Sequence, residues 1–321
     1  MFSFYKYYTS KSILEEGGNV FDSTSPIKKE YINPTLRQFF KEFGEIFPRA
    51  HAHFEGVRTL GSVGKKALSG DIDLALSEDS FKNISDWGLD ENRVKEHFVL
   101  FKKRVKTSTD EQLTKRAVIV SIAEKIQASD KDILVDIKGS SGGSLFCQFP
   151  QYDEQGNKTE LYVQIDINVG NVDWLSFAYH SAVYKGNVKG LHRTQLLVAL
   201  FSHKGYTFSH NYGVKNKETQ EIEANSPDQA IEMLNSLYGM ELSAKTVGDY
   251  FTLMKEMKRK IPLVDLHEVF DSYLRILDST RADIPEDLQQ YWINNQGRLG
   301  LKGKYLPDDS NLASHKIGGT L

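Results

Sequence analysis

Two aspartates spaced two residues apart in an apolar stretch are the clearest chemical feature of the sequence. Asp71 and Asp73 flank Ile72, and the apolar residues 74–76 follow. Side chains two apart on a strand point to the same face, so both carboxylates would project together, roughly 7 Å apart at the backbone. Buried unpaired carboxylates are costly, and a divalent cation offsets that cost. Because Mg²⁺ prefers carboxylate and phosphate oxygens, the pair predicts a metal and triphosphate site.

A turn of small residues precedes these aspartates. Gly61-Ser62 follows a short apolar stretch at 57–60, and eight residues separate Ser62 from Asp71. Glycine lets the backbone approach a phosphate closely, amides at a following helix start can donate to its oxygens, and the serine hydroxyl adds a donor. Lys65 lies in the spacer, where its ammonium group either neutralises a triphosphate or stays in solvent. We therefore expect Gly61, Ser62 and Lys65 to bind the nucleotide.

A third carboxylate is needed to complete a two-metal site, in which one ion activates the attacking hydroxyl and the other steadies the leaving pyrophosphate. Asp166 lies between Ile165 and Ile167 in an apolar stretch, where an aspartate is expensive unless it binds a cation. Asp136 has the same local pattern. The residue pattern alone leaves both candidates open.

Taken together, these motifs resemble a known superfamily. Gly-Ser, a short spacer, Asp-x-Asp in a strand and a later apolar-Asp-apolar strand look like the DNA polymerase β-type nucleotidyltransferases. The segment from 145 to 206 is also similar to the palm region of the family X polymerases. The matching features are Cys147-Gln148, a charged hairpin, Ile165-Asp166-Ile167, the aromatic-rich stretch 177–181 and Lys204-Gly205-Tyr206. The resemblance covers roughly residues 55–210.

The resemblance implies roles for individual residues. Asp71, Asp73 and Asp166 would bind two Mg²⁺ ions, with Mn²⁺ as a substitute. Gly61 and Ser62 would hold the nucleotide phosphates, and Asp166 would help to deprotonate the acceptor hydroxyl.

Several further residues are interpreted with this resemblance in view. The strand order favours Asp166 over Asp136. Arg193, beside a predicted helix start, would reach a phosphate, although a surface salt bridge explains it equally well. Two departures are evident, because no helix-hairpin-helix element is recognised and the insert at 77–132 is long and helical. The resemblance thus supports nucleotidyl transfer more strongly than it supports DNA polymerisation.

Hydrophobic periodicity predicts an α+β protein. Strands are expected at 57–60, 72–76, 133–137, 145–149 and 161–169, the last three as an antiparallel meander. Helices are expected from Asn33-Pro34 to 46, at 91–106, 110–128 and 190–202, and across 226–292, with a helical turn at 63–68. The predicted architecture is a nucleotidyltransferase-fold catalytic domain at 1–190, with a mixed or antiparallel sheet, and a mainly helical C-terminal region at 191–321.

Composition limits the partners and the compartment. The chain has 321 residues and a net charge of −3, which disfavours a dedicated duplex binder because phosphate neutralisation drives such affinity. No run of about eighteen apolar residues exists, so no membrane span is expected, and the N-terminus lacks the pattern of a secretory signal. The single cysteine, Cys147, fits a core position and a reducing cytoplasm.

The resulting hypothesis is a metal-dependent nucleotidyltransferase. It would move an NMP from ATP or another NTP to an acceptor hydroxyl and release pyrophosphate. The expected acceptor is an RNA 3′ end, such as that of tRNA, because a modest charge and a helical second region suit a shaped RNA. The alternatives are a family X-like DNA polymerase, a protein or small-molecule nucleotidylyltransferase, and a silent nucleotide-binding module. Base preference and oligomeric state are left open.

Overall fold

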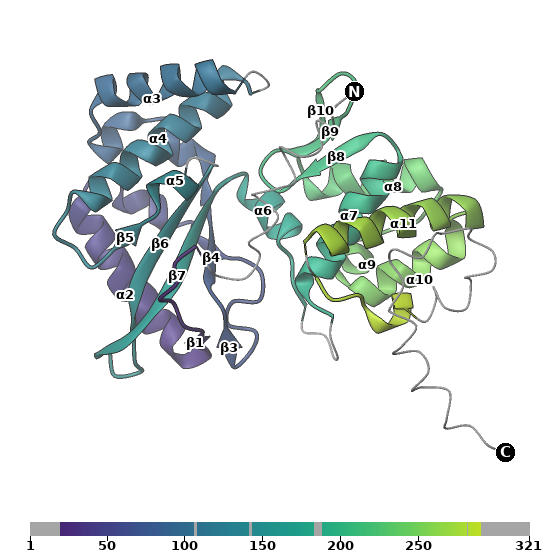
Figure 1. Ribbon diagram of the computed structural model, residues 1–321, viewed down its shortest axis with the longest axis horizontal. Helices are drawn as coiled ribbons and strands as arrows, with labels where there is room; N and C mark the ends of the chain where they lie inside the picture. Colours follow the sequence, from purple (N-terminus) through teal and green to yellow (C-terminus); the bar gives the residue numbers. More distant parts are fainter. Residues whose placement is uncertain (1–19, 106–107, 141–142, 183–187, 281, 290–321) are drawn as a thin grey trace.

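A mixed five-stranded sheet forms the centre of the N-terminal lobe (Figure 1). The structure, a computed structural model, describes residues 20–105, 108–140, 143–182, 188–280 and 282–289. The strands lie in the order β2 (Arg58–Thr59), β4 (Ile72–Ser77), β7 (Lys158–Gly170), β6 (Ser144–Tyr152) and β5 (Leu134–Val135). Only β4 and β7 run parallel, and the other neighbours are antiparallel. The expected meander is confirmed, and it joins the first strands through the parallel pair.

Alternation along the strands separates the two faces of this sheet. Ile165, Ile167 and the other odd-numbered residues of β7 from 163 to 169 are buried in an apolar cluster that also contains α2 (Lys29–Ile46) and α4 (Asp110–Gln127). The even-numbered positions carry Gln164, Asp166 and Asn168 on the opposite face. The helices therefore cover the apolar face, and the polar face is left for the site.

Helix α2 begins earlier than the sequence indicated. We expected a start at Asn33-Pro34, but the helix begins at Lys29 and contains Pro34. Ile32 is buried and continues the apolar stripe of Leu36, so burial of the preceding turn outweighs the backbone hydrogen bond that proline removes. The strand β1 (Ile27–Lys28) directly precedes α2 in the chain and forms a short two-stranded ribbon with β3 (Leu68–Ser69).

The C-terminal lobe is mainly helical, as expected (Figure 1). Its helices are α7 (Gly190–His203), α8 (Pro227–Tyr238), α9 (Ala244–Gly248), α10 (Tyr250–Lys260) and α11 (Leu263–Ser279). It also contains a three-stranded antiparallel sheet that the sequence did not indicate, made of β8 (Tyr206–Ser209), β9 (Gly213–Asn216) and β10 (Ile222–Ala224). These strands have three or four residues each, which is too few for an alternation of apolar and polar residues to be recognised in the sequence.

Two large hydrophobic clusters fill the lobes, and a small third one joins Leu60 and Ala75 to Leu175 of α6. The cluster of the first lobe runs from Ile27 to Val169, and that of the second begins at Trp174 in α6 (Val172–Ala178) and ends at Leu288. Packing thus changes from one lobe to the other just after β7. The boundary near residue 190 stays a prediction, and residues 1–19 and 290–321 of the two predicted regions lie outside the described residues. No helix in the described segments is long and apolar enough to cross a membrane.

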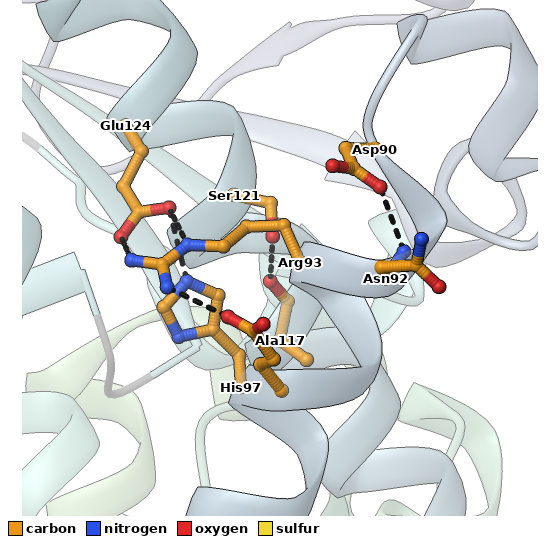
Figure 2. A network of polar contacts seen from close by, with 8 residues as sticks. Asp90, Asn92, Arg93, His97, Ala117, Ser121 and Glu124 are labelled. Atoms are coloured by element: carbon orange, nitrogen blue, oxygen red, sulfur yellow. Dashed lines mark hydrogen bonds and ion pairs between the residues drawn. The ribbon is translucent and has the colours of Figure 1, made fainter.

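The long helical insert forms a hairpin of α3 (Glu91–Arg104) and α4, as expected. Figure 2 shows the polar network that joins them. The Arg93 guanidinium donates to both carboxylate oxygens of Glu124, from Nε at 2.9 Å and Nη2 at 2.6 Å. His97 Nε2 lies 3.0 Å from Glu124 Oε2. Donation by Arg93, and then by His97, holds the pKa of Glu124 below its ordinary value.

We predict that Glu124→Gln lowers the free energy of unfolding by about 1 kcal/mol at neutral pH, because a half-exposed guanidinium loses a charged partner. The folded-state pKa of Glu124 is depressed, so its contribution is present above the ordinary value of 4.5 and is lost as pH falls through the folded-state value. When the wild type and Glu124→Gln are unfolded by a chemical denaturant at several pH values, their free energies of unfolding should therefore converge in acid.

Glu96→Gln is the matched control, since exposed Glu96 accepts one hydrogen bond from Arg93. Its expected cost is about 0.3 kcal/mol or less. Equal losses in the two variants, or a gap that persists in acid, would contradict this account of the hairpin.

Candidate active site

Two of the predicted carboxylates lie side by side on neighbouring strands. In the parallel pair of β4 and β7, Asp73 is directly opposite Asp166. Strand neighbours are about 4.8 Å apart, and paired residues project to the same face. Asp166 is 7% exposed, and Asp73 is half-buried. Asp71, also half-buried, lies just before β4, and burial raises the pKa of its carboxyl group. The structure therefore gathers the three predicted aspartates around one end of the β4–β7 pair.

The Gly61 turn closes against the same carboxylate. Leu60 extends the pairing of β2 with β4, since its N–H donates to the carbonyl oxygen of Asp73 at 2.8 Å. Gly61 then turns the chain with φ +60°, and a Cβ placed on it would lie 3.5 Å from Oδ2 of Asp73. An isolated bridge pairs Gly61 with His180, which follows α6. The turn thus lies between the aspartates and the segment after β7.

The segment after Gly61 is not helical. We expected a helical turn at 63–68 whose first amides face a phosphate. Instead, Ser62 begins a turn in which the Lys65 N–H donates to the Ser62 carbonyl oxygen at 3.0 Å, and the chain then enters β3. Only Leu68 and Ser69 of the spacer pair with β1, so a turn followed by a short extended segment stands where the helix was expected. Any anion here would meet the Gly61 turn and not a helix N-terminus.

Basic groups lie on the other side of the turn. Lys65 Nζ donates to the carbonyl oxygen of Ser181 at 2.7 Å, and partial desolvation lowers the pKa of Lys65. Burial, and then the charges of Arg193 and Lys65, lower the pKa of His180. The charges of these two side chains therefore create a positive potential around His180. Acidic and basic groups meet at Gly61, an arrangement suited to cations bound to a polyphosphate.

Arg193 is more deeply buried than its predicted role requires. Its side chain is 0% exposed, and its guanidinium donates to the carbonyl oxygens of Val247 at 2.8 Å and Phe177 at 2.5 Å. It also lies over the Phe177 ring, 4.5 Å from the centroid. Arg193 thus joins α7 to the ends of α6 and α9. Its predicted contact with a nucleotide remains a prediction, and its charge contributes to the lowered pKa of His180.

Asp136, the alternative third carboxylate, has a local structural explanation. It directly precedes the short helix α5 (Ile137–Ser140). Its Oδ1 accepts a hydrogen bond from the backbone N–H of Lys138 at 3.0 Å, and its own carbonyl oxygen accepts one from Ser140. A carboxylate that caps a helical turn needs no cation.

Sequence reasoning overlooked the polar neighbours of Asp166. Gln164 donates through Nε2 to both oxygens of that carboxylate, at 2.9 and 3.0 Å. Asn168 accepts a hydrogen bond from Ser144 through Oδ1. The signal was the alternation of polar residues at 164, 166 and 168 between apolar ones. Cys147 is fully buried on the apolar face, as expected of a core residue, and burial raises the pKa of its thiol.

The aspartates are gathered but not preassembled around an ion. Within the ranges that the structure describes, no three His, Cys, Asp or Glu side chains converge as a ready set of metal ligands. Metal binding is accordingly proposed below and is not part of the observed geometry.

Comparisons with known proteins include distant likenesses to solved structures. No protein-family model matches the sequence, and a search of curated proteins gives no match. Among solved structures, the chain is similar to Leishmania infantum polymerase beta in a ternary P/T complex, with 13% identity and a TM-score of 0.34 over 70% of this chain and 76% of that chain. The ternary gap complex of the same polymerase is 14% identical, with a TM-score of 0.30 over 78% of this chain and 68% of that chain. Likenesses this remote carry no argument, so function is inferred from the site.

We predict that Gly61→Ala and Gly64→Ala separate backbone strain from contact with the site. Both glycines have positive φ, so each alanine should lower the free energy of unfolding by about 1–2 kcal/mol. A Cβ at Gly64 meets nothing within 4 Å, whereas one at Gly61 meets the Asp73 carboxylate. Thermal denaturation should therefore show similar losses, while nucleotide binding should weaken only in Gly61→Ala. Equal weakening of binding in both variants would exclude the Gly61 turn as a contact.

Proposed function

We propose that the protein is a metal-dependent nucleotidyltransferase of the polymerase β-like type. The observation that carries this proposal is the parallel pairing of Asp73 with Asp166, with the Gly61 turn against the Asp73 carboxylate. Two acidic side chains on adjacent strands, next to a positively charged segment, suit the joint binding of cations and a triphosphate. The large apolar core of the sheet lies on the other face, so the two carboxylates are not part of it.

The chemistry of the donors fits a hard divalent cation. Asp71, Asp73 and Asp166 offer only carboxylate oxygens, which Mg²⁺ prefers at about 2.1 Å, with Mn²⁺ as a substitute. Asp73 and Asp166 are register partners on adjacent strands and project to one face, which places both carboxylates where they could share one ion. When bound, the two ions supply positive charge to the triphosphate and the leaving pyrophosphate.

The residues of the chain would position the reacting groups. The backbone at Gly61 and the Ser62 hydroxyl hold phosphate oxygens, with Lys65 nearby as a compensating charge. The Asp166 carboxylate orients the acceptor hydroxyl toward the α-phosphorus and takes its proton. The hydroxyl oxygen forms a new bond to the α-phosphorus, the bond from that phosphorus to the bridging oxygen breaks, and pyrophosphate leaves with the electron pair of the broken bond. Positioning and charge stabilisation supply most of the rate.

For the acceptor, we propose an RNA 3′ end. The net charge of −3 argues against a general duplex binder, and a helical lobe beside the site suits a shaped RNA. An acceptor panel tests this directly: tRNA, a primed DNA template, and protein alone, each with labelled NTPs or dNTPs and Mg²⁺ or Mn²⁺. Label on tRNA without a template supports RNA. Templated dNMP incorporation or labelled protein would replace RNA as the acceptor.

We predict that Asp73→Asn and Asp166→Asn each lower nucleotidyl transfer at least about 100-fold, because each removes a charge that the transition state requires. Asp136→Asn is the matched control, since this aspartate has the same apolar neighbours but caps α5. Transfer should stay near the wild-type rate in that variant. Survival of transfer in Asp166→Asn, or an equal loss in Asp136→Asn, would overturn the assignment.

A further inference from the structure

A segment before β1 crosses the polar side of β6 and β7. Residues 20–26, here named the N-terminal strap, are held by glutamine amides of these strands. Gln148 Nε2 donates to Ser23 Oγ at 2.9 Å, and Gln151 Nε2 donates to the carbonyl oxygen of Ser25 at 3.0 Å. The Val20 N–H donates to Oε1 of Gln164 at 3.1 Å. Of these amides, that of Gln164 also contacts a predicted site residue.

The strap determines which way the Gln164 amide faces. A backbone N–H can only donate, so the group that meets Val20 must be the amide oxygen. The amide nitrogen then necessarily faces Asp166, where it donates to both carboxylate oxygens at 2.9 and 3.0 Å. Gln164 is 1% exposed, so water does not compete for these bonds. The reversed amide would place two oxygens against each other and leave the Val20 N–H without an acceptor.

We propose that Gln164, locked by the N-terminal strap through Val20, is a positioning residue that orients the carboxylate of Asp166. This inference rests on the proposed function, since it assigns a partner to Asp166 in that site. The connection runs from the Val20 backbone to the amide and from the amide to the carboxylate. The strap and the site thus share one hydrogen-bonded chain, although more than a hundred residues separate them in sequence.

The carboxylate keeps enough capacity for an ion in this arrangement. An ionised carboxylate offers about four lone-pair positions, and the amide uses one on each oxygen. The two bonds from Gln164 therefore do not exhaust the acceptor capacity of the Asp166 carboxylate, which lies on the same face of the sheet as Asp73. Partners of this kind that orient a metal ligand are typically worth about 10–100-fold in metal affinity or activity.

The first test detects the hydrogen-bonded chain without any metal. The side-chain amide signals of Gln164 are assigned in a ¹H–¹⁵N spectrum by their loss in Gln164→Met, a variant that keeps the length of the side chain and removes its polar group. They should shift in Asp166→Asn and in Val20→Pro, which deletes the N–H that the amide oxygen accepts. Asp22→Pro is the control, because Asp22 is exposed in the adjoining turn and its N–H donates to no described group. Unshifted amide signals in Asp166→Asn or Val20→Pro would overturn the proposal.

The second test measures the consequence for the site with Mn²⁺ alone. Titration followed by electron paramagnetic resonance should give about 10-fold weaker binding for Gln164→Met, and a smaller loss for Val20→Pro. Asp22→Pro should bind as the wild type does. In turnover with NTP, kcat should fall in Gln164→Met while KM for the nucleotide holds, because Gln164 contacts Asp166 and not the Gly61 turn.

The outcomes separate this inference from the proposed function. If the amide signals respond as expected but the wild type binds no Mn²⁺, the hydrogen-bonded chain stands and the metal-dependent function fails. If Mn²⁺ binds and depends on Asp166 but not on Gln164, the function stands and the positioning role is wrong. Weaker Mn²⁺ binding in Gln164→Met with an unchanged melting temperature is the result that supports both.

Discussion

The parallel pairing of β4 with β7 is the constraint on which the rest of the site depends. It places Asp73 opposite Asp166, although nearly a hundred residues lie between them, and it does so by backbone register rather than by side-chain attraction. A slip of one residue would turn Asp166 into the apolar core and Ile165 toward the site. Burial of Ile165 and Ile167 under α2 and α4 therefore fixes the position of the carboxylate on the opposite face. The free energy that folds the sheet also aligns the acidic pair.

The parts that the sequence predicted are those with a strong local signal. Period-two alternation located β4, β6 and β7, and the Asp-Ile-Asp spacing identified residues on one face. The parallel register of Asp73 with Asp166 could not be derived, because it depends on packing across the chain. Nor could the burial of Arg193, which is a tertiary contact of α7 with two distant carbonyl groups. The contact of Gln164 with Asp166 could have been predicted, because the two residues are two apart on one strand. The contact of Gln164 with the strap could not.

Charge is divided across the Gly61 turn in a way that composition conceals. A net charge of −3 describes the whole chain, whereas at Gly61 the Asp73 carboxylate lies against the turn and the charges of Lys65 and Arg193 act on His180, which pairs with Gly61. The lobes contribute unequally, since β4 and β7 supply the acids while α7 supplies a buried cation. The deep burial of Arg193 gives its charge a fixed position that does not depend on a flexible side chain.

Energetic coupling between Asp73 and Asp166 tests the shared site most directly. Mn²⁺ affinity should be measured for the wild type, Asp73→Asn, Asp166→Asn and the double variant. If both carboxylates bind one ion, the double variant should lose little more affinity than either single variant. Losses that add as independent contributions, or an affinity that neither substitution changes, would contradict a common ion between the two strands.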